Sequence, residues 1–262
     1  MWIIKNKGFS RRWGALMTVL LLGIMPMRAQ ITDDLLLAVD SILELLVNDT
    51  VTMVSQTQKQ AQRLQNDTTH HRILLFGDSM LDGVGRRFYE YAQESGHYLF
   101  TSIWYGSTTH SWARTTELDR LMDQVKPTFV IISLGTNDLG YHDLKARSES
   151  VKEILRVVGD IPYVWIGPAK LPKLNKDFGV VDMLRETIGD DLYYNSYNER
   201  LARLKDNVHP TFAASAAWVD KVVRWMNRPE APYHIRLDFP TQKYTFKNYE
   251  THSPRYKRKM KN

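Results

Sequence analysis

Residues 74–85 read LLFGDSMLDGVG, and this stretch joins an apolar run to a polar turn. The apolar residues do not alternate with polar ones, which is typical of a strand that is buried on both faces. The run ends in Gly77, Asp78 and Ser79, so a buried strand delivers a hydroxyl group that lies between two carboxylates, Asp78 and Asp82. For the two acids, turn and helix-cap roles suffice. The serine is the residue whose role the remaining sequence must decide.

The same pattern of a short apolar run followed by a helical pattern recurs along the chain. The strand candidates are Ile73–Phe76, Leu99–Trp104, Phe129–Leu134, Tyr163–Ile166 and a weaker Leu192–Tyr194. The helical patterns cover residues 85–94, 113–124, 148–158, 181–188 and 212–226. This alternation predicts an α/β fold, namely a doubly wound, flavodoxin-like three-layer sandwich around a central parallel sheet of about five strands.

The chain of 262 residues divides into four parts by composition. Residues 1–29 have the pattern of a signal peptide, and residues 30–71 form a long helical pattern followed by a linker. The α/β domain is expected over residues 72–228. Residues 229–262 form a basic tail, which we expect to be disordered or to lie on the surface.

The net charge of +6 is concentrated at the two ends of the chain. Residues 1–29 hold five Lys/Arg and no acid, and residues 242–262 hold seven Lys/Arg and one Glu. Subtracting these from the totals of 35 and 29 leaves 23 basic and 28 acidic residues in the body. A body with a net charge of −5 argues against nucleic acid as a partner. The absence of cysteine excludes disulfides and thiolate metal sites.

The first 29 residues predict export. Four Lys/Arg precede the apolar run 13–25, which is shorter than the roughly 20 residues needed to span a bilayer. Cleavage is expected after Ala29. Because Met27 is bulkier than the small residue usual two positions earlier, an uncleaved anchor is the alternative and would be the only contact with a membrane. The expected location is the periplasm or the cell envelope.

Polar loops follow the predicted strands at their carboxyl ends, where functional loops of such a sheet gather. The loops are Gly77-Asp78-Ser79, the stretch YGSTT at 105–109, the stretch GTND at 135–138 and the stretch DNVHP at 206–210. A serine hydroxyl becomes a good nucleophile when a histidine takes its proton, and the imidazole must be oriented by an acceptor. Asp206, three residues before His209, can reach back to that ring. Ser79, His209 and Asp206 are therefore the predicted catalytic set.

These four motifs, in this order and spacing, resemble the SGNH/GDSL hydrolase family over residues 72–227. The second motif fits least well, because a glycine after a strand is common. The resemblance implies a serine esterase whose oxyanion is bound by the backbone N–H groups of Ser79 and Gly106 and by the side-chain amide of Asn137. An amide is a neutral donor that no pH change removes.

Aromatic and basic residues near these loops are candidate substrate contacts. Tyr105 begins the second motif, Trp104 and Trp112 flank it, and stacking of these rings on sugars is one interpretation. The alternatives are that Trp104 is the buried end of a strand and that Trp112 is a helix staple. Lys170 belongs to a basic loop after the fourth strand that could favour an anionic substrate. The alternative for that loop is a solvated surface segment.

We therefore predict an exported serine esterase that removes O-acetyl groups from a carbohydrate through an acyl-Ser79 intermediate. Its partner would be a small-molecule or glycan ester, and no cofactor is expected, because no metal, nucleotide or flavin site emerges. An O-acetyltransferase, a lipid esterase or a thioesterase would use the same triad. A non-catalytic envelope protein that binds glycan or an assembly partner is the hypothesis from another class. The sequence gives no indication of oligomeric state.

Overall fold

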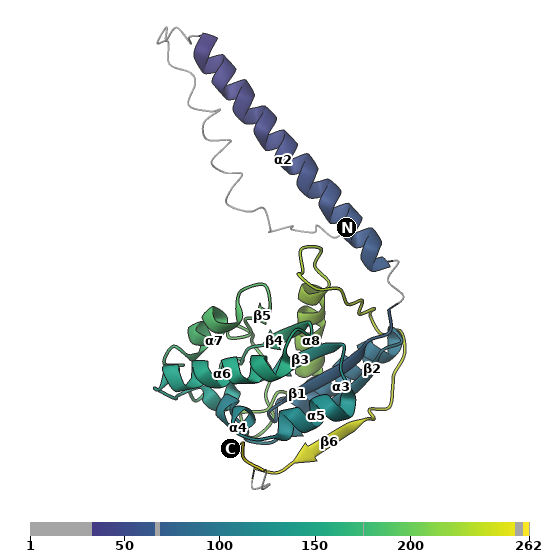
Figure 1. Cartoon of the computed structure of the whole chain (residues 1–262), viewed down its shortest axis with the longest axis vertical. Helices are drawn as coiled ribbons and strands as arrows, with labels where there is room; N and C mark the ends of the chain where they lie inside the picture. The colour runs from purple at the N-terminus through teal and green to yellow at the C-terminus, as the bar shows by residue number, and fades with distance from the viewer. Residues whose placement is uncertain (1–32, 66–68, 175, 255–258, 262) are drawn as a thin grey trace, which may run out of the picture. The chain divides into compact units, whose positions relative to one another are not determined.

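The computed structural model describes residues 33–65, 69–174, 176–254 and 259–261 (Figure 1). The signal peptide predicted for residues 1–29 lies outside the described residues. The strands are β1 (Arg72–Gly77), β2 (Tyr98–Trp104), β3 (Phe129–Ser133), β4 (Tyr163–Ile166), β5 (Tyr193–Tyr194) and β6 (Tyr249–His252). They pair in parallel in the order β5-β4-β3-β1-β2-β6.

The order of the first five strands is that of a flavodoxin-like sheet, which confirms the predicted fold class. The chain runs outward from β1 in one direction to β2 and in the other through β3, β4 and β5. The order therefore reverses between β1 and β3. The carboxyl ends of these two strands form the switch point, where ligands bind in folds of this type.

Helices cover both faces of the sheet (Figure 1). They are α3 (Leu81–Glu94), α4 (Thr109–Ala113), α5 (Glu117–Val125), α6 (Leu144–Val158), α7 (Val180–Ile188) and α8 (Phe212–Met226), with a 3₁₀ turn η1 (Thr136–Asp138). Ile73 and Leu75 pack with α3 and α8, whereas Leu74 and Phe76 pack with α4 to α7. Because both faces of β1 are buried, its sequence is a continuous apolar run, as the sequence analysis indicated.

The helical pattern at 113–124 is interrupted. The chain leaves α4 after Ala113 and enters α5 at Glu117, and Thr115 between them forms an antiparallel bridge with Met260. The N–H of Thr116 donates to the Lys259 carbonyl over 2.9 Å. Two β-branched threonines, which disfavour helix, thus exchange helical bonds for bonds to a distant segment.

The segment after residue 228 contributes to the core and to the sheet. Ala231, Tyr233, Ile235 and Leu237 are buried against the α3–α8 side. Farther along, β6 pairs with residues 101–104 of β2 as a sixth strand. The expectation of a disordered or surface tail is therefore wrong for these residues. Their alternating apolar pattern, rather than the basic composition of the tail, was the signal for burial.

Helix α2 (Asp33–Gln65) is continuous over 33 residues, as the uninterrupted helical pattern predicted. It carries exposed apolar side chains, including Val39, Ile42, Leu43 and Leu46. Within the described residues, no helix combines the length and the apolar character needed to cross a membrane.

Candidate active site

Ser79 lies where β1 ends against β3. A Cβ atom at Gly77 would lie 2.0 Å from the Ser133 carbonyl oxygen, so only glycine lets the two strands approach this closely. The N–H of Asp78 donates to the same carbonyl over 3.2 Å. The Asp78 carboxylate then accepts the Met80 N–H over 3.0 Å and turns the chain into α3. Helix α3 begins at Leu81, four residues before the predicted start, which places Ser79 just before its N-terminus.

His209 and Asp206 meet Ser79 in the predicted order. The Ser79 hydroxyl lies 2.8 Å from His209 Nε2, and His209 Nδ1 lies 2.7 Å from Asp206 Oδ2. A carboxylate only accepts, so the proton of the neutral ring is on Nδ1 and Nε2 is available to take the serine proton. Residues 130 positions apart in the chain are thus in hydrogen-bond contact.

The loop that carries the histidine is closed by several hydrogen bonds. The second oxygen of Asp206 accepts the N–H groups of Val208 and His209 over 2.8 and 3.0 Å. Asn207 makes the turn with φ of 57°, in the left-handed region that asparagine tolerates better than most residues. The N–H of Leu204 donates to the His209 carbonyl over 2.8 Å. The carboxylate therefore orients the imidazole with both of its oxygens engaged.

The two acids near the nucleophile have opposite electrostatics. The hydrogen bond from His209 lowers the pKa of Asp206 to about 2, with help from the backbone N–H groups of Val208 and His209. Asp206 is therefore ionised throughout the neutral range. Burial raises the pKa of Asp78 to about 7. The different surroundings of Asp206 and Asp78 thus give the orienting carboxylate a low pKa and the structural acid a high one.

Gly106 and Asn137 occupy the loops on either side of β1. Gly77 is in register with Ile103 of β2 and with Ser133 of β3, so both loops leave the sheet beside Ser79. The Asn137 side-chain amide donates to the Ser107 carbonyl over 2.9 Å and ties the two loops together. Gly106 has φ of 70°, a conformation that favours glycine.

The backbone donors expected at an oxyanion site have no acceptor among the residues that the structure describes. Within the described part of the chain, neither Ser79 N–H nor Gly106 N–H makes a hydrogen bond. The Asn137 amide has two N–H groups, and the bond to Ser107 uses one of them. Their action on an oxyanion remains a prediction.

Residues that the sequence did not single out support this arrangement. The buried Asp138 accepts the N–H and the hydroxyl of Thr109 over 2.9 and 2.8 Å, and Arg147 lies 3.3 Å from its carboxylate. Burial raises the pKa of Asp138, and the Thr109 bonds oppose that rise. Two loops that bear predicted donors are thus joined a second time. A polar residue immediately after Asn137 was the signal available in the sequence.

A cavity of 130 Å³ opens beside the serine and is lined by Ser79, Asp82, Leu204, His209 and Phe212, among others. Tyr105 belongs to its surroundings, because its hydroxyl donates to Asp82 over 2.6 Å. Tyr105 is thus bonded to a residue of the cavity wall, and its contact with a substrate stays a prediction.

Trp104 and Trp112 are core residues, and the prediction that they stack on a sugar is wrong. Trp104 is 7% exposed and Trp112 is fully buried. Their rings pack against each other at a centroid distance of 5.5 Å, and Trp112 donates its indole N–H to the Ser107 hydroxyl. The alternative of a strand end and a packed helix residue applies, because the apolar faces are used inside the protein.

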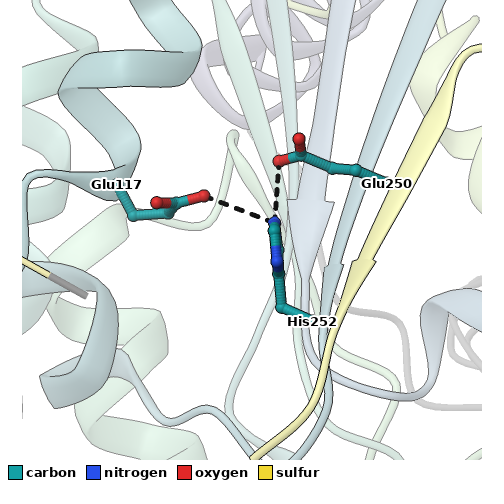
Figure 2. A group of neighbouring side chains, drawn as sticks. All are labelled: Glu117, Glu250 and His252. Carbon is teal, nitrogen blue, oxygen red and sulfur yellow. Dashed lines mark ion pairs between the residues drawn. The ribbon is translucent and has the colours of Figure 1, made fainter. Parts of the chain in front are cut away.

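A separate group of metal-ligand residue types lies at the β6 edge of the sheet (Figure 2). His252 Nε2 lies 3.5 Å from Glu117 and 3.2 Å from Glu250. Arg120 binds both carboxylates, that of Glu117 over 2.6 Å. The arginine therefore supplies the positive charge that the acids require, and the group links β6 to α5.

No protein-family model matches the chain, and no curated protein matches it. Several solved structures are similar at low identity. An α/β-hydrolase enzyme from the metagenome of Lake Arreo, Spain, has 12% identity and a TM-score of 0.49, with 62% of this chain and 99% of that chain covered. An acetyl xylan esterase has 15% identity and a TM-score of 0.41, with 58% and 98% covered. The catalytic domain of a Streptococcus pneumoniae peptidoglycan O-acetyltransferase has 15% identity and a TM-score of 0.45, with 62% and 95% covered.

Proposed function

We propose that this protein is an exported serine esterase of the SGNH/GDSL type that removes O-acetyl groups from a carbohydrate. The observation that carries the proposal is the continuous hydrogen-bonded chain from Ser79 through His209 to Asp206, with links of 2.8 and 2.7 Å. A nucleophile, a base and an orienting acid in one line are what acyl transfer at neutral pH requires.

In the first step the Ser79 oxygen attacks the acyl carbonyl carbon while its proton passes to His209 Nε2. Asp206 stabilises the imidazolium that forms, because its carboxylate accepts the Nδ1 proton and is fixed by two backbone N–H groups. The sugar oxygen leaves with the proton from Nε2. Water then repeats the sequence on the acyl-serine and releases the acid.

The negative charge on the tetrahedral intermediate falls on the former carbonyl oxygen. The N–H groups of Ser79 and Gly106 and the second N–H of Asn137 are the donors assigned to it. Because the Ser107 carbonyl holds the amide in place, the donor needs no reorganisation when charge develops. The location of Ser79 before the N-terminus of α3 adds a favourable dipole.

Export and the acetyl group rest on the sequence and on the size of the cavity. The charged and apolar pattern of residues 1–29 supports export. A cavity of 130 Å³ beside Ser79 suits a short acyl chain better than a long one.

The decisive experiment measures acid release from a small acetyl ester by purified residues 30–262. Ser79→Ala and His209→Ala should each abolish turnover and leave the circular dichroism unchanged. His234→Ala, at an exposed histidine outside the site, is the matched control and should retain activity. Full activity in either of the first two variants would end the proposal.

A fluorophosphonate probe separates an enzyme from a binding protein. An activated Ser79 should be labelled in the wild type and not in Ser79→Ala, whereas a non-catalytic binder would resist labelling in both. An acetylated sugar that accumulates when a free sugar is added would instead identify an acetyltransferase.

A further inference from the structure

A second cavity, of 530 Å³, lies beside the loop that carries His209. Its walls come from the segment after β4 and from the segment between β5 and α8. Lys170, Tyr197, Arg200 and Arg203 are among its lining residues. We call it the cationic cavity.

The positive charges of this cavity are not neutralised within it. Among the described residues, no carboxylate oxygen lies within 4.0 Å of Lys170, Arg200 or Arg203, whereas most other arginines of the α/β domain are paired. The acid in the lining, Glu199, is already engaged by Lys221 over 2.5 Å and by the Tyr194 hydroxyl. The cavity therefore has an excess of positive charge on a body that is acidic overall.

Arg203 is held in place by backbone carbonyl groups, and the Asp206 carboxylate acts on its charge from beyond ion-pair distance. Its guanidinium donates to the carbonyl oxygens of Val208 and Lys170, the latter over 2.9 Å. These two bonds leave other N–H groups of the fork for a ligand. Lys170 Nζ lies 6.0 Å from the centroid of the Tyr197 ring, so an aromatic ring and a cation border the same space.

The cationic cavity and the cavity at Ser79 lie on the two sides of one loop. Arg203 lines the first cavity, and its neighbour Leu204 lines the second together with His209. Arg203 forms an antiparallel β-bridge with Pro210, and the N–H of Leu204 donates to the His209 carbonyl. Adjacent Cα atoms are about 3.8 Å apart. The two cavities are therefore neighbours along this loop, as a polymeric ligand that occupies both would require.

We propose that the cationic cavity binds a carboxylate group of the substrate, so that the preferred substrate is an O-acetylated glycan that contains acidic sugars. This inference rests on the proposed function and defines its substrate class. An aromatic ring beside cations suits a sugar ring that bears a carboxylate. The aromatic ring can pack on the apolar face of the sugar, and the cations can bind its carboxylate. Arginine and lysine each form charge-assisted hydrogen bonds to such a group.

The kinetic test compares chemically O-acetylated polygalacturonate with the same polymer after its carboxylates have been reduced to alcohols. The readout is the ratio of kcat/KM for acetate release from the acidic over the neutral polymer. We expect a ratio of about 10 or more in the wild type, since one charge-assisted hydrogen bond is worth about one factor of ten. Arg200→Ala and Lys170→Ala should each lower the ratio, and the double variant should bring it close to 1.

Arg224→Ala is the matched control, because Arg224 is an exposed arginine in the last turn of α8 and lines neither cavity. The Arg224→Ala variant removes one positive charge outside both cavities, so it measures the effect of net charge alone. We expect it to leave the ratio unchanged. Equal turnover of both polymers by the wild type, or an equal fall of the ratio in Arg224→Ala, would overturn the inference.

A binding measurement separates this inference from the proposed function. Calorimetry on Ser79→Ala should show that an oligogalacturonate binds more tightly than its carboxyl-reduced form, and that Arg200→Ala removes the difference. If neither polymer is turned over, the proposed esterase function fails. If neither oligosaccharide binds, or both bind equally, the cationic cavity does not recognise carboxylates.

Discussion

The free energy of unfolding of the Asp78→Asn variant should increase relative to that of the wild type as the pH rises. Asp78 is 1% exposed, and burial raises the pKa of its carboxyl group from 3.8 to about 7. The hydrogen bond from Met80 opposes this rise, and the carboxylate of Asp138 adds to it. The folded protein therefore holds a proton on Asp78 that the unfolded chain releases at a lower pH.

The direction follows from proton binding. Between pH 3.8 and about 7 the folded state binds more protons than the unfolded state, so the wild type loses stability as the pH rises through this window. At 1.36 kcal/mol per pH unit, the loss approaches about 4 kcal/mol at pH 8. Asn cannot ionise, while its carbonyl oxygen can still accept the Met80 N–H.

Urea unfolding followed by tryptophan fluorescence at pH 4.5, 6 and 7.5 measures the effect. The free energy of unfolding of the variant minus that of the wild type should increase by roughly 3 kcal/mol across this range. Asp160→Asn, in an exposed turn, is the control for removal of one carboxylate. A difference between Asp78→Asn and the wild type that is the same at all three pH values would show that Asp78 is ionised in the fold and would refute the reasoning.

Three further predictions concern the donors, the core and the β6 edge. Asn137→Ala should lower kcat for an acetyl ester by about 100- to 1,000-fold with little change in KM, as stopped-assay kinetics would show. Trp112→Ala should lower the free energy of unfolding by about 3–5 kcal/mol, because it empties a fully buried site; a loss below 1 kcal/mol in urea unfolding would contradict the core assignment. Arg120→Ala should lower the free energy of unfolding by only about 1 kcal/mol, since the side chain is 41% exposed. Added Zn²⁺ should raise the melting temperature of this variant more than that of the wild type, as calorimetry would measure.

The parallel sheet could be predicted because its strands are apolar on both faces and end in short polar loops. All five predicted strands have boundaries within one residue of those observed. Helix ends were harder. Helix α3 starts early because the Asp78 carboxylate accepts the Met80 N–H and turns the chain into the helix. The helical pattern after Trp112 breaks because Thr116 bonds to a segment more than 140 residues away, and such a distant contact leaves no local pattern.

The contact between Ser79 and His209 could be predicted for a similar reason. Each catalytic residue follows a strand or precedes a helix at the same edge of the sheet, so fold class and spacing together determine that they meet. Trp104 and Trp112 show where this reasoning stops. Proximity to the site along the chain says nothing about which face a ring presents, and both rings are taken up by the core.

The cationic cavity depends on information of another kind. Lys170 could be recognised as a basic residue near the site, but a lysine attracts an anion only where no protein carboxylate already neutralises it. That condition depends on Glu199, whose carboxylate is bound by Lys221 over 2.5 Å. Lys221 lies 22 positions farther along the chain. If Lys221→Ala released Glu199, the freed carboxylate would compete with the substrate for Arg200 and Lys170. The preference for the acidic polymer should then fall in Lys221→Ala although no residue assigned to carboxylate binding has been changed, and an unchanged preference would mean that Glu199 does not control the charge of the cavity.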